Sequence, residues 1–369
     1  MRVLVVVEQL RRAVPGGIGR YAAGLLAGLA DGALAADDTV ELFASRPPRG
    51  ADPLADLGFA VRTLPLPGPL LTRAWDYGRA PAPGGFDVVH AVSMAAPPAG
   101  GARLVVMVHD LAWREFPEAT TARGRRWHEA TLGRVLRRAD ALGVPSLPVA
   151  EALAAAGATV PVAVLPPGVD HLPPPDRPAA DLLLRRLGVS GPFLLSVGTL
   201  EPRKNLRQLF SAYAEARSSL PEPWPLVVVG PTGWGADAGP AVDESGRTPV
   251  GVVMAGSVAD GVLAALYERA RVLAYVPLVE GYGIPPLEAM TFGTPVVASR
   301  GVPSVQADDG PAALIVDAGS AQSIAQGIVE VATDGPRRDD LRQRGLALAG
   351  TRTWRKAARG HVELWRSLA

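Results

Sequence analysis

Two glutamates, Glu280 and Glu288, flank a loop of sequence GYGIPP and could together hold a ligand rich in hydroxyl groups. Carboxylates accept hydrogen bonds from vicinal hydroxyls, and the two glycines let backbone amides approach a ligand closely. The two prolines suit the first turn of a helix, where their missing N–H groups cost nothing. This predicts Glu288 in that first turn and Glu280 at a strand end. The structural alternative is that Glu288 caps its helix and Glu280 is solvated.

Two further loops have the composition of phosphate sites. Arg203 and Lys204 are adjacent and precede Asn205, which is a good residue to cap a helix. A guanidinium fork and an ammonium group beside a helix N-terminus would bind phosphate, although an ordinary solvated turn is the alternative. Near the N-terminus, the loop around Gly17 could bring backbone amides against a diphosphate, and no Walker motif occurs in the chain.

Each of these loops follows a short apolar run, and such runs alternate with longer helix-like stretches along the chain. Runs that are apolar on both faces are typical of parallel sheets covered by helices, where ligands bind at the carboxyl ends of strands. The expected strands span residues 3–7, 40–44, 88–91, 104–108, 141–144, 162–165, 193–197, 226–229, 252–255, 272–276, 295–298 and 313–316.

The pattern predicts an α/β protein with two Rossmann-like, doubly wound domains that face each other across a cleft. At 369 residues the chain is long enough for two domains. We expect a first domain over residues 1–172, a proline-rich linker over 173–189 and a second domain over 190–351. A final helix, within 352–369, is expected to pack back on the first domain.

Composition excludes several classes of function. The 37 basic and 36 acidic residues nearly cancel, which argues against a nucleic-acid-binding protein. The absence of cysteine excludes disulfides, thiolate catalysis and zinc–thiolate sites, and the five scattered histidines form no HExxH pair. No apolar stretch reads as a signal peptide or a transmembrane helix, so we expect a cytoplasmic protein.

Together, the loops resemble retaining glycosyltransferases of the GT-B fold, namely glycosyltransferase family 4, the group 1 family. The most specific feature is the spacing of Glu280 and Glu288, which continues into AMTFGTPVVAS. Agreement extends to SVGTLEPRKNL (196–206), VVVGPTGWG (227–235) and VHDLAWREFPE (108–118). The chain departs from the family at three positions, where Phe, Asn and Glu are common and this sequence has Tyr282, Pro167 and Ser304.

The resemblance implies a role for each matching position. Arg203 and Lys204 would hold the donor pyrophosphate, and Glu288 would bind the ribose hydroxyls of the nucleotide. The amide of Gly17 would press against the phosphate. His109 would reach the donor sugar or phosphate from the first domain, and the alternative is a buried histidine with only structural contacts.

The donor sugar would be held by Glu280 and by the backbone amides of Tyr282, Gly283 and Ile284. The resemblance implies front-side attack by the acceptor, with the leaving phosphate as base. Arg203 and Lys204 would stabilise its developing charge. No Asp-x-Asp motif occurs, which agrees with an enzyme that needs no metal or other cofactor.

The segment EGYGIPPLEAM is most similar to that of mannosyl- and rhamnosyl-transferring bacterial members of the family, which build surface polysaccharides. This implies GDP-mannose, or a UDP- or dTDP-linked hexose, as the donor. The acceptor would be a glycan, a lipid-linked sugar or a small molecule. Two alternatives stay open: a nucleotide-sugar-binding protein without catalysis, and a GT-B-fold nucleotide-sugar epimerase.

Residues 123–139 predict an amphipathic helix with an arginine-rich face that includes Arg134 and Trp127. Such a face could touch anionic lipid at the inner surface of the cell membrane, or a lipid-pyrophosphate acceptor. An ordinary solvated face is the favoured interpretation.

Overall fold

The computed structural model describes residues 1–233 and 248–369, which divide into two compact units. The last two residues of the predicted VVVGPTGWG motif, Trp234 and Gly235, lie outside the described residues. The first unit consists of three segments of chain: Met1–Leu111, Ala122–Gly168 and Arg352–Ala369.

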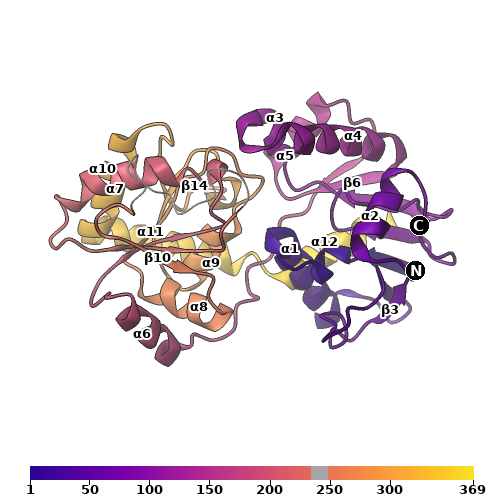
Figure 1. The fold of residues 1–369 in the computed structure, drawn as a ribbon, viewed down its shortest axis with the longest axis horizontal. Coiled ribbons are helices and arrows are strands. Elements are labelled where there is room, and N and C mark those ends of the chain that lie inside the picture. The colour runs from indigo at the N-terminus through magenta and orange to yellow at the C-terminus, as the bar shows by residue number, and fades with distance from the viewer. Residues whose placement is uncertain (234–247) are drawn as a thin grey trace. The chain divides into compact units, whose positions relative to one another are not determined.

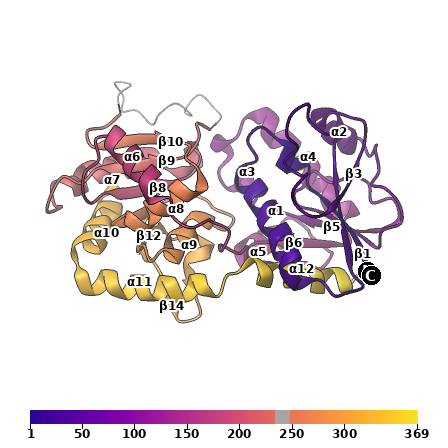
Figure 2. The same cartoon turned by 90° about the horizontal axis from the view of Figure 1, so that it is seen from below.

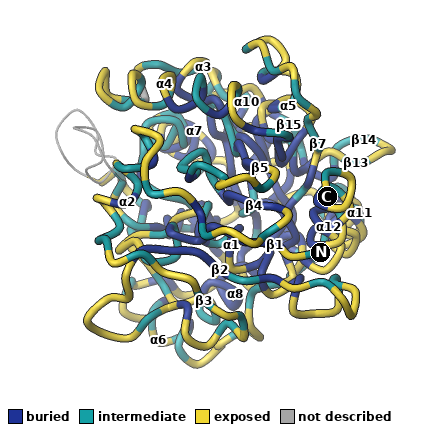
Figure 3. Tube along the Cα trace, turned by 90° about the vertical axis from the view of Figure 1, so that its right-hand side faces the viewer, coloured by how far each residue is buried: buried dark blue, intermediate teal, exposed yellow. Residues whose placement is uncertain are grey.

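The first unit is built on a parallel sheet with strand order β3-β2-β1-β4-β5-β6-β7. Figure 1 labels two of these strands, β3 and β6. The inner strands are buried because their residues are apolar on both faces, and Figure 3 shows them enclosed beneath exposed connecting loops. The strands are β1 (Arg2–Val6), β2 (Thr39–Ala44), β3 (Ala60–Thr63), β4 (Val88–Ala91), β5 (Arg103–Met107), β6 (Ala141–Val144) and β7 (Val162–Val164). The main helices are α1 (Gly16–Gly28), α2 (Gly68–Asp76), α4 (Ala122–Arg138), α5 (Leu147–Ala155) and α12 (Trp354–Arg366).

The C-terminal helix α12 belongs to the first unit and packs directly along α1 (Figure 2). Two glycines of α1 make this close approach achievable. A Cβ on Gly24 would lie 2.0 Å from the indole of Trp354, and one on Gly28 would lie 2.1 Å from the Trp354 carbonyl oxygen. The small residues therefore let the two helices pack almost backbone to backbone.

The second unit comprises Ala112–Thr121 and Val169–Thr351 and has a parallel sheet of order β10-β9-β8-β11-β12-β15. Its strands are β8 (Leu194–Val197), β9 (Leu226–Val229), β10 (Val252–Gly256), β11 (Val272–Tyr275), β12 (Val296–Ser299) and β15 (Leu314–Val316). Its helices are α3 (Ala112–Glu115), α6 (Arg177–Arg186), α7 (Leu206–Arg217), α8 (Asp260–Arg269), α9 (Ile284–Thr291), α10 (Ala321–Thr333) and α11 (Gly335–Gly350). A short hairpin, β13 (Gln306–Ala307) with β14 (Gly310–Pro311), lies between β12 and β15.

Neighbouring residues on one strand of this sheet enter opposite cores, as the pleat requires. Leu195 packs in a core with α6, α8 and α9, whereas Leu194 packs in a second core with α7 and α10. Both faces of the sheet are thus covered by helices, and the second unit is doubly wound. The α/β fold class predicted from the sequence is confirmed.

Every predicted strand forms, with each end within one residue of its expected position. The edge strand β3 was not predicted, because none of its four residues is buried and it lacks an apolar run. Within the described ranges, no helix has the length and apolarity that crossing a bilayer requires.

The predicted domain boundaries need correction. Residues 173–189, expected as a linker, include α6, which the Asp176 side chain caps by accepting from the Ala179 amide. The helix forms because Leu184 and Ala180 are buried within the second unit. The many prolines of this stretch had led to the prediction of a linker. Residues 112–121 and 169–172, expected in the first domain, group with the second unit.

Candidate functional site

Two loops of the second unit meet because the strands that precede them are neighbours. β8 and β11 pair in parallel, so the loop from β8 to α7 and the loop from β11 to α9 leave the same edge of the sheet. The first loop contains Arg203 and Lys204, and the second contains Glu280. Residues that follow two different strands in the sequence thus come together in one cluster.

Glu280 lies at the centre of this cluster. Its Oε2 is 2.5 Å from Lys204 Nζ and accepts a hydrogen bond of 2.6 Å from the Tyr275 hydroxyl. Its Oε1 is 3.2 Å from Arg203 Nη1. Arg203 Nε also pairs with Glu201 Oε1 at 2.7 Å, and Lys204 Nζ donates to the Tyr275 oxygen at 2.8 Å.

The cluster holds its charges in a largely closed environment, with side-chain exposure of 11% for Glu280 and 12% for Lys204. Burial alone would raise the pKa of Glu280, but the charges of Lys204 and Arg203 and their hydrogen bonds hold it well below its usual range. Burial and the Glu280 charge raise the pKa of Tyr275, so its phenol stays protonated and donates. A group kept ionised so firmly is a poor proton acceptor.

The turn after Glu280 requires glycine at position 283. Gly283 has φ +91°, and a Cβ there would lie 2.7 Å from Val302 Cγ1. Helix α9 begins at the next residue, Ile284, without a side-chain cap, and the Tyr282 carbonyl accepts from the Ser304 amide at 2.9 Å. The three positions expected to offer amides to a donor sugar therefore form the approach to a helix N-terminus.

Glu288 occupies a different place from the one predicted. It is the fifth residue of α9, beyond the first turn, and it is only 2% exposed. Its Oε1 is 3.0 Å from His171 Nε2, and its Oε2 accepts from the Tyr267 hydroxyl at 2.9 Å. The helix begins at Ile284, so the two prolines fill its first turn and Glu288 falls at a buried position in the next turn. Capping of its own helix, the structural alternative, is thereby excluded.

Asn205 is not the side-chain cap that its position before α7 predicted. Its amide instead donates to the carbonyl oxygens of Val276 at 3.1 Å and Ala318 at 2.8 Å. Its backbone has φ +60°, a left-handed conformation that asparagine tolerates better than most residues. Asn205 therefore ties the loop that carries Lys204 to the end of β11.

The first unit carries the other two predicted positions, Gly17 and His109. Gly17 lies in the first turn of α1, which has no side-chain cap, and apart from its own helix backbone no atom of the described residues lies within 4 Å of where its Cβ would be. Its amide is therefore placed where helix N-termini bind anions. His109 is half-buried, with Nε2 2.8 Å from the Val92 carbonyl oxygen, and burial lowers its pKa.

Several residues of these sites were not predicted. Tyr275 was within reach of sequence reasoning because it ends the strand before Glu280. Glu201 was also within reach, since it lies two residues before Arg203 in the same loop. His171 and Tyr267 carry no local signal, because their partner Glu288 lies 117 and 21 residues away and these contacts depend on the tertiary fold.

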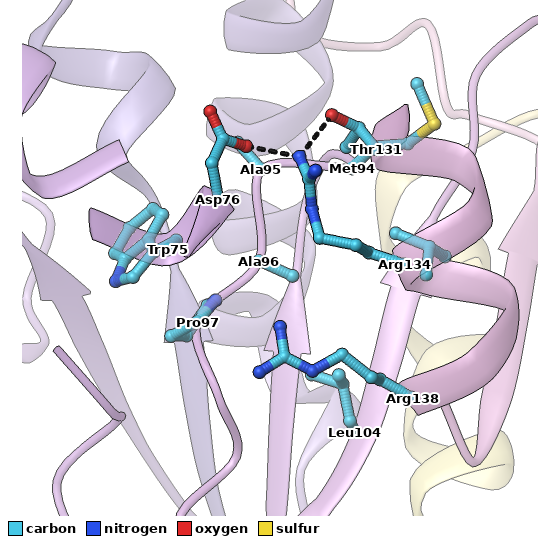
Figure 4. A pocket seen from close by; sticks show the side chains of 11 residues that line it. Trp75, Asp76, Met94, Ala95, Ala96, Pro97, Leu104, Thr131, Arg134 and Arg138 are labelled. Carbon is cyan, nitrogen blue, oxygen red and sulfur yellow. Dashed lines mark hydrogen bonds and ion pairs between the residues drawn. The ribbon is translucent and has the colours of Figure 1, made fainter. Parts of the chain in front are cut away.

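The basic helix predicted over 123–139 forms as α4 and borders an open hollow of about 330 Å³ beside α2 (Figure 4). Arg134 points into it and pairs with Asp76 at 2.5 Å, while Trp127 Nε1 donates to the same carboxylate at 3.0 Å. Arg134 also donates to Thr131 at 2.7 Å. Both side chains pair with Asp76 of α2 and Trp127 stays 39% exposed, which fits the favoured interpretation of an ordinary solvated helix face.

Comparison with known proteins gives matches over both halves. Residues 15–171 match the family model for Glycosyltransferase Family 4, and residues 186–347 match the model for Glycosyl transferases group 1. O-antigen chain mannosyltransferase B of Escherichia coli is 34% identical over 176 residues. That alignment covers 48% of this chain and 46% of the relative, so the match spans less than half of each.

Solved structures match over the full chain. Sucrose-phosphate synthase from Thermosynechococcus elongatus has a TM-score of 0.74 at 20% identity and covers 100% of this chain, with 99% of its own chain matched. HepE of Anabaena, solved in complex with UDP and glucose, has a TM-score of 0.73 at 19% identity, with 100% of both chains matched. At this identity the likeness shows the fold.

Proposed function

The chain belongs to the group 1 glycosyltransferases of family 4, with the GT-B fold, and from this premise we propose that it moves a hexose from a nucleotide-diphosphate sugar to a hydroxyl acceptor with retention of configuration. The observation that carries the proposal is the cluster of Arg203, Lys204 and Glu280. In this cluster two cations and one carboxylate lie after the carboxyl ends of paired strands, where ligands bind in such sheets. We infer that Arg203 and Lys204 hold the pyrophosphate while Glu280 and the turn at Gly283 hold the sugar.

The proposed reaction is a front-side attack. The acceptor oxygen bonds to the anomeric carbon as the bond from that carbon to the phosphate oxygen breaks, and the acceptor proton passes to the departing phosphate. Arg203 and Lys204 stabilise the charge that develops on this phosphate. The low pKa of Glu280 argues against an epimerase, which needs a carboxylate that accepts and returns a proton.

For the donor we favour mannose, because the relative with 34% identity is named as a mannosyltransferase. HepE, at 19% identity, is described with UDP and glucose, so a UDP-linked hexose is the second candidate. We place the reaction in the cytoplasm, with a glycan, a lipid-linked sugar or a small molecule as the acceptor. Contact of α4 with a membrane is not part of the proposal, since Trp127 and Arg134 hold Asp76.

The first test is a thermal-shift screen of the full chain against GDP-mannose, UDP-glucose, UDP-GlcNAc, dTDP-rhamnose and the free diphosphates. A donor at a hundred times its dissociation constant should stabilise the fold by about 2.7 kcal/mol. We expect a shift with one nucleotide base, followed by release of the corresponding diphosphate when acceptors are added. Binding without any cleavage of the donor would favour the alternative of a non-catalytic binding protein.

The second test replaces the cations one at a time. Arg203→Ala and Lys204→Ala should each lower turnover by about 10²–10³-fold, because each removes a charge that stabilises the leaving phosphate. Arg177→Ala is the matched control, since Arg177 pairs with Glu268 on the surface of α8 and should leave turnover unchanged. Activity that survives both changes would show that the phosphate lies elsewhere.

A further inference from the structure

A buried polar cluster lies between α1 and α12, within the first unit. Tyr21 of α1 is 1% exposed, and His361 of α12 is 0% exposed. The Tyr21 hydroxyl is 2.5 Å from His361 Nε2, a hydrogen bond between residues 340 positions apart. Burying a polar group costs free energy unless the group is hydrogen-bonded, so loss of either partner would leave the other buried and unsatisfied.

The hydrogen bonds of His361 fix which nitrogen carries its proton. Its Nδ1 is 2.7 Å from the Ala357 carbonyl oxygen, which can only accept, so Nδ1 is protonated. Burial lowers the pKa of His361 to about 4, so the ring is neutral near pH 7 and Nε2 is an acceptor. Burial also raises the pKa of Tyr21, whose hydroxyl therefore donates to Nε2. This bond holds the tyrosine ring in one orientation.

The ring of Tyr21 in turn contacts His109. The two ring centroids are 4.8 Å apart with an interplanar angle of 76°, an edge-type contact. Within the described residues, two contacts hold the His109 ring: the Val92 carbonyl accepts from Nε2, and the Tyr21 ring packs against it. The second nitrogen, Nδ1, has no hydrogen bond to the described parts of the chain and can accept one from a substrate hydroxyl.

We propose that His361 is a positioning residue for His109 and acts through Tyr21, so that the C-terminal helix α12 takes part in transfer and does more than stabilise the first unit. The proposal rests on the proposed function, because His109 takes part in a reaction only if the chain moves a sugar. Tyr21 also lies one helical turn after Gly17 on α1.

The kinetic test uses variants that remove the Tyr21–His361 bond with little change of shape. Tyr21→Phe deletes only the hydroxyl, whereas His361→Phe deletes the Nε2 acceptor together with the Nδ1–H donor to the Ala357 carbonyl. Each should lower kcat about 10- to 100-fold, because small misplacements of a reacting group carry costs of this order, with the donor KM within about twofold. His361→Gln, whose amide oxygen can accept from Tyr21, should recover most of the loss.

Val362→Ala is the matched control, since Val362 is a buried apolar neighbour on the same helix and lies outside this hydrogen-bonded chain. All rates are measured well below each variant's melting temperature. A purely structural pair would lower Tm in every variant and leave kcat unchanged. The proposal is overturned by kcat within twofold of the parent in Tyr21→Phe and His361→Phe, or by an equal loss in Val362→Ala.

A second readout does not depend on activity and separates this proposal from the proposed function. Imidazole ¹⁵N NMR of the full chain, with the His109 signal assigned by its absence in His109→Gln, should show a single tautomer protonated on Nε2. In Tyr21→Phe and His361→Phe we expect this signal to broaden or to shift toward a mixture of the two tautomers. In Val362→Ala it should stay unchanged. An unchanged signal in the first two variants overturns the positioning of His109 by His361, whereas a parent chain that turns over no donor overturns the proposed function and with it the role of α12 in transfer.

Discussion

The Glu280 carboxylate pairs with both neighbouring cations, Arg203 and Lys204. Replacing this one side chain therefore tests the electrostatics of the cluster. Glu280→Gln keeps the shape and leaves Lys204 and Arg203 less compensated, which should lower the free energy of unfolding by up to about 3–5 kcal/mol. A nucleoside diphosphate supplies the missing negative charge, so it should raise Tm more in this variant than in the parent chain. Thermal shifts over a series of diphosphate concentrations measure the difference.

Glu268→Gln is the control for this prediction, because Glu268 pairs with Arg177 at an exposed site. It should leave both the Tm and the diphosphate response close to those of the parent. Equal diphosphate shifts in the parent and in Glu280→Gln would mean that the ligand does not meet Lys204 and Arg203.

Sequence reasoning could name Arg203, Lys204 and Glu280 because residue type and position after a strand both indicate chemistry. It passed over Glu201, although this residue lies two positions from Arg203 in the same loop, and it missed the inward position of Glu288, which depends on where α9 begins. The hydrogen-bond partner of Tyr21 could not be predicted from the sequence. His361 lies 340 positions away and has no local pattern that distinguishes it from any other helical histidine.

Among the elements, α12 is held by a histidine that must stay neutral, so its packing should depend on pH. The unfolded chain protonates this imidazole near pH 6.5, but the folded chain does so only near pH 4. Proton binding therefore favours the unfolded state between these two pH values. As the pH is lowered from 6.5 to 4, this group should reduce the free energy of unfolding by up to about 3 kcal/mol. Urea unfolding at pH 7, 6, 5 and 4 measures the slope.

His361→Gln removes this titration and should flatten the curve. Burial also lowers the pKa of His90, which faces His361 at 5.3 Å between ring centroids, and that of His109, so some slope should remain. Parallel curves for the parent and for His361→Gln would show that His361 does not contribute to the acid sensitivity of the first unit.

Elements were predictable where burial on two faces leaves a continuous apolar run, as in β4, β6 and β9, whose ends match the prediction. The failures share a cause. The edge strand β3 is defined by pairing with β2 and not by its own residues, and α6 lies in a stretch whose prolines suggested a linker. Tertiary contacts decide such segments, and no local pattern records them.

For the molecule as a whole, the first unit should depend on its last segment. A chain ending at Thr351 loses Trp354, His361 and Trp365, each buried to 2% exposure or less. We expect amide protection, measured by hydrogen exchange, to collapse in β1, β4 and β5 because large buried side chains contribute several kcal/mol each. The strands β8, β9 and β11 should stay protected.

A chain ending at Arg366 is the control, because it keeps the whole of α12 and should exchange like the full chain. Protection that persists in β1, β4 and β5 after truncation at Thr351 would mean that the first unit does not need α12. At this scale the order of motifs was enough to predict the family and the fold. The division of the chain into units was not, since residues 112–121 contact the second unit from within the first half.

The three-segment construction of the first unit also bears on how the chain emerges from a ribosome. The second unit has all its residues once Thr351 is made, whereas the first unit waits for Arg352–Ala369. At ordinary translation speeds the first half is therefore exposed for roughly 10–40 s with the surface of α1 uncovered. The half synthesised first should be the half that finishes folding last, and it is the one that a nascent-chain chaperone would need to shield.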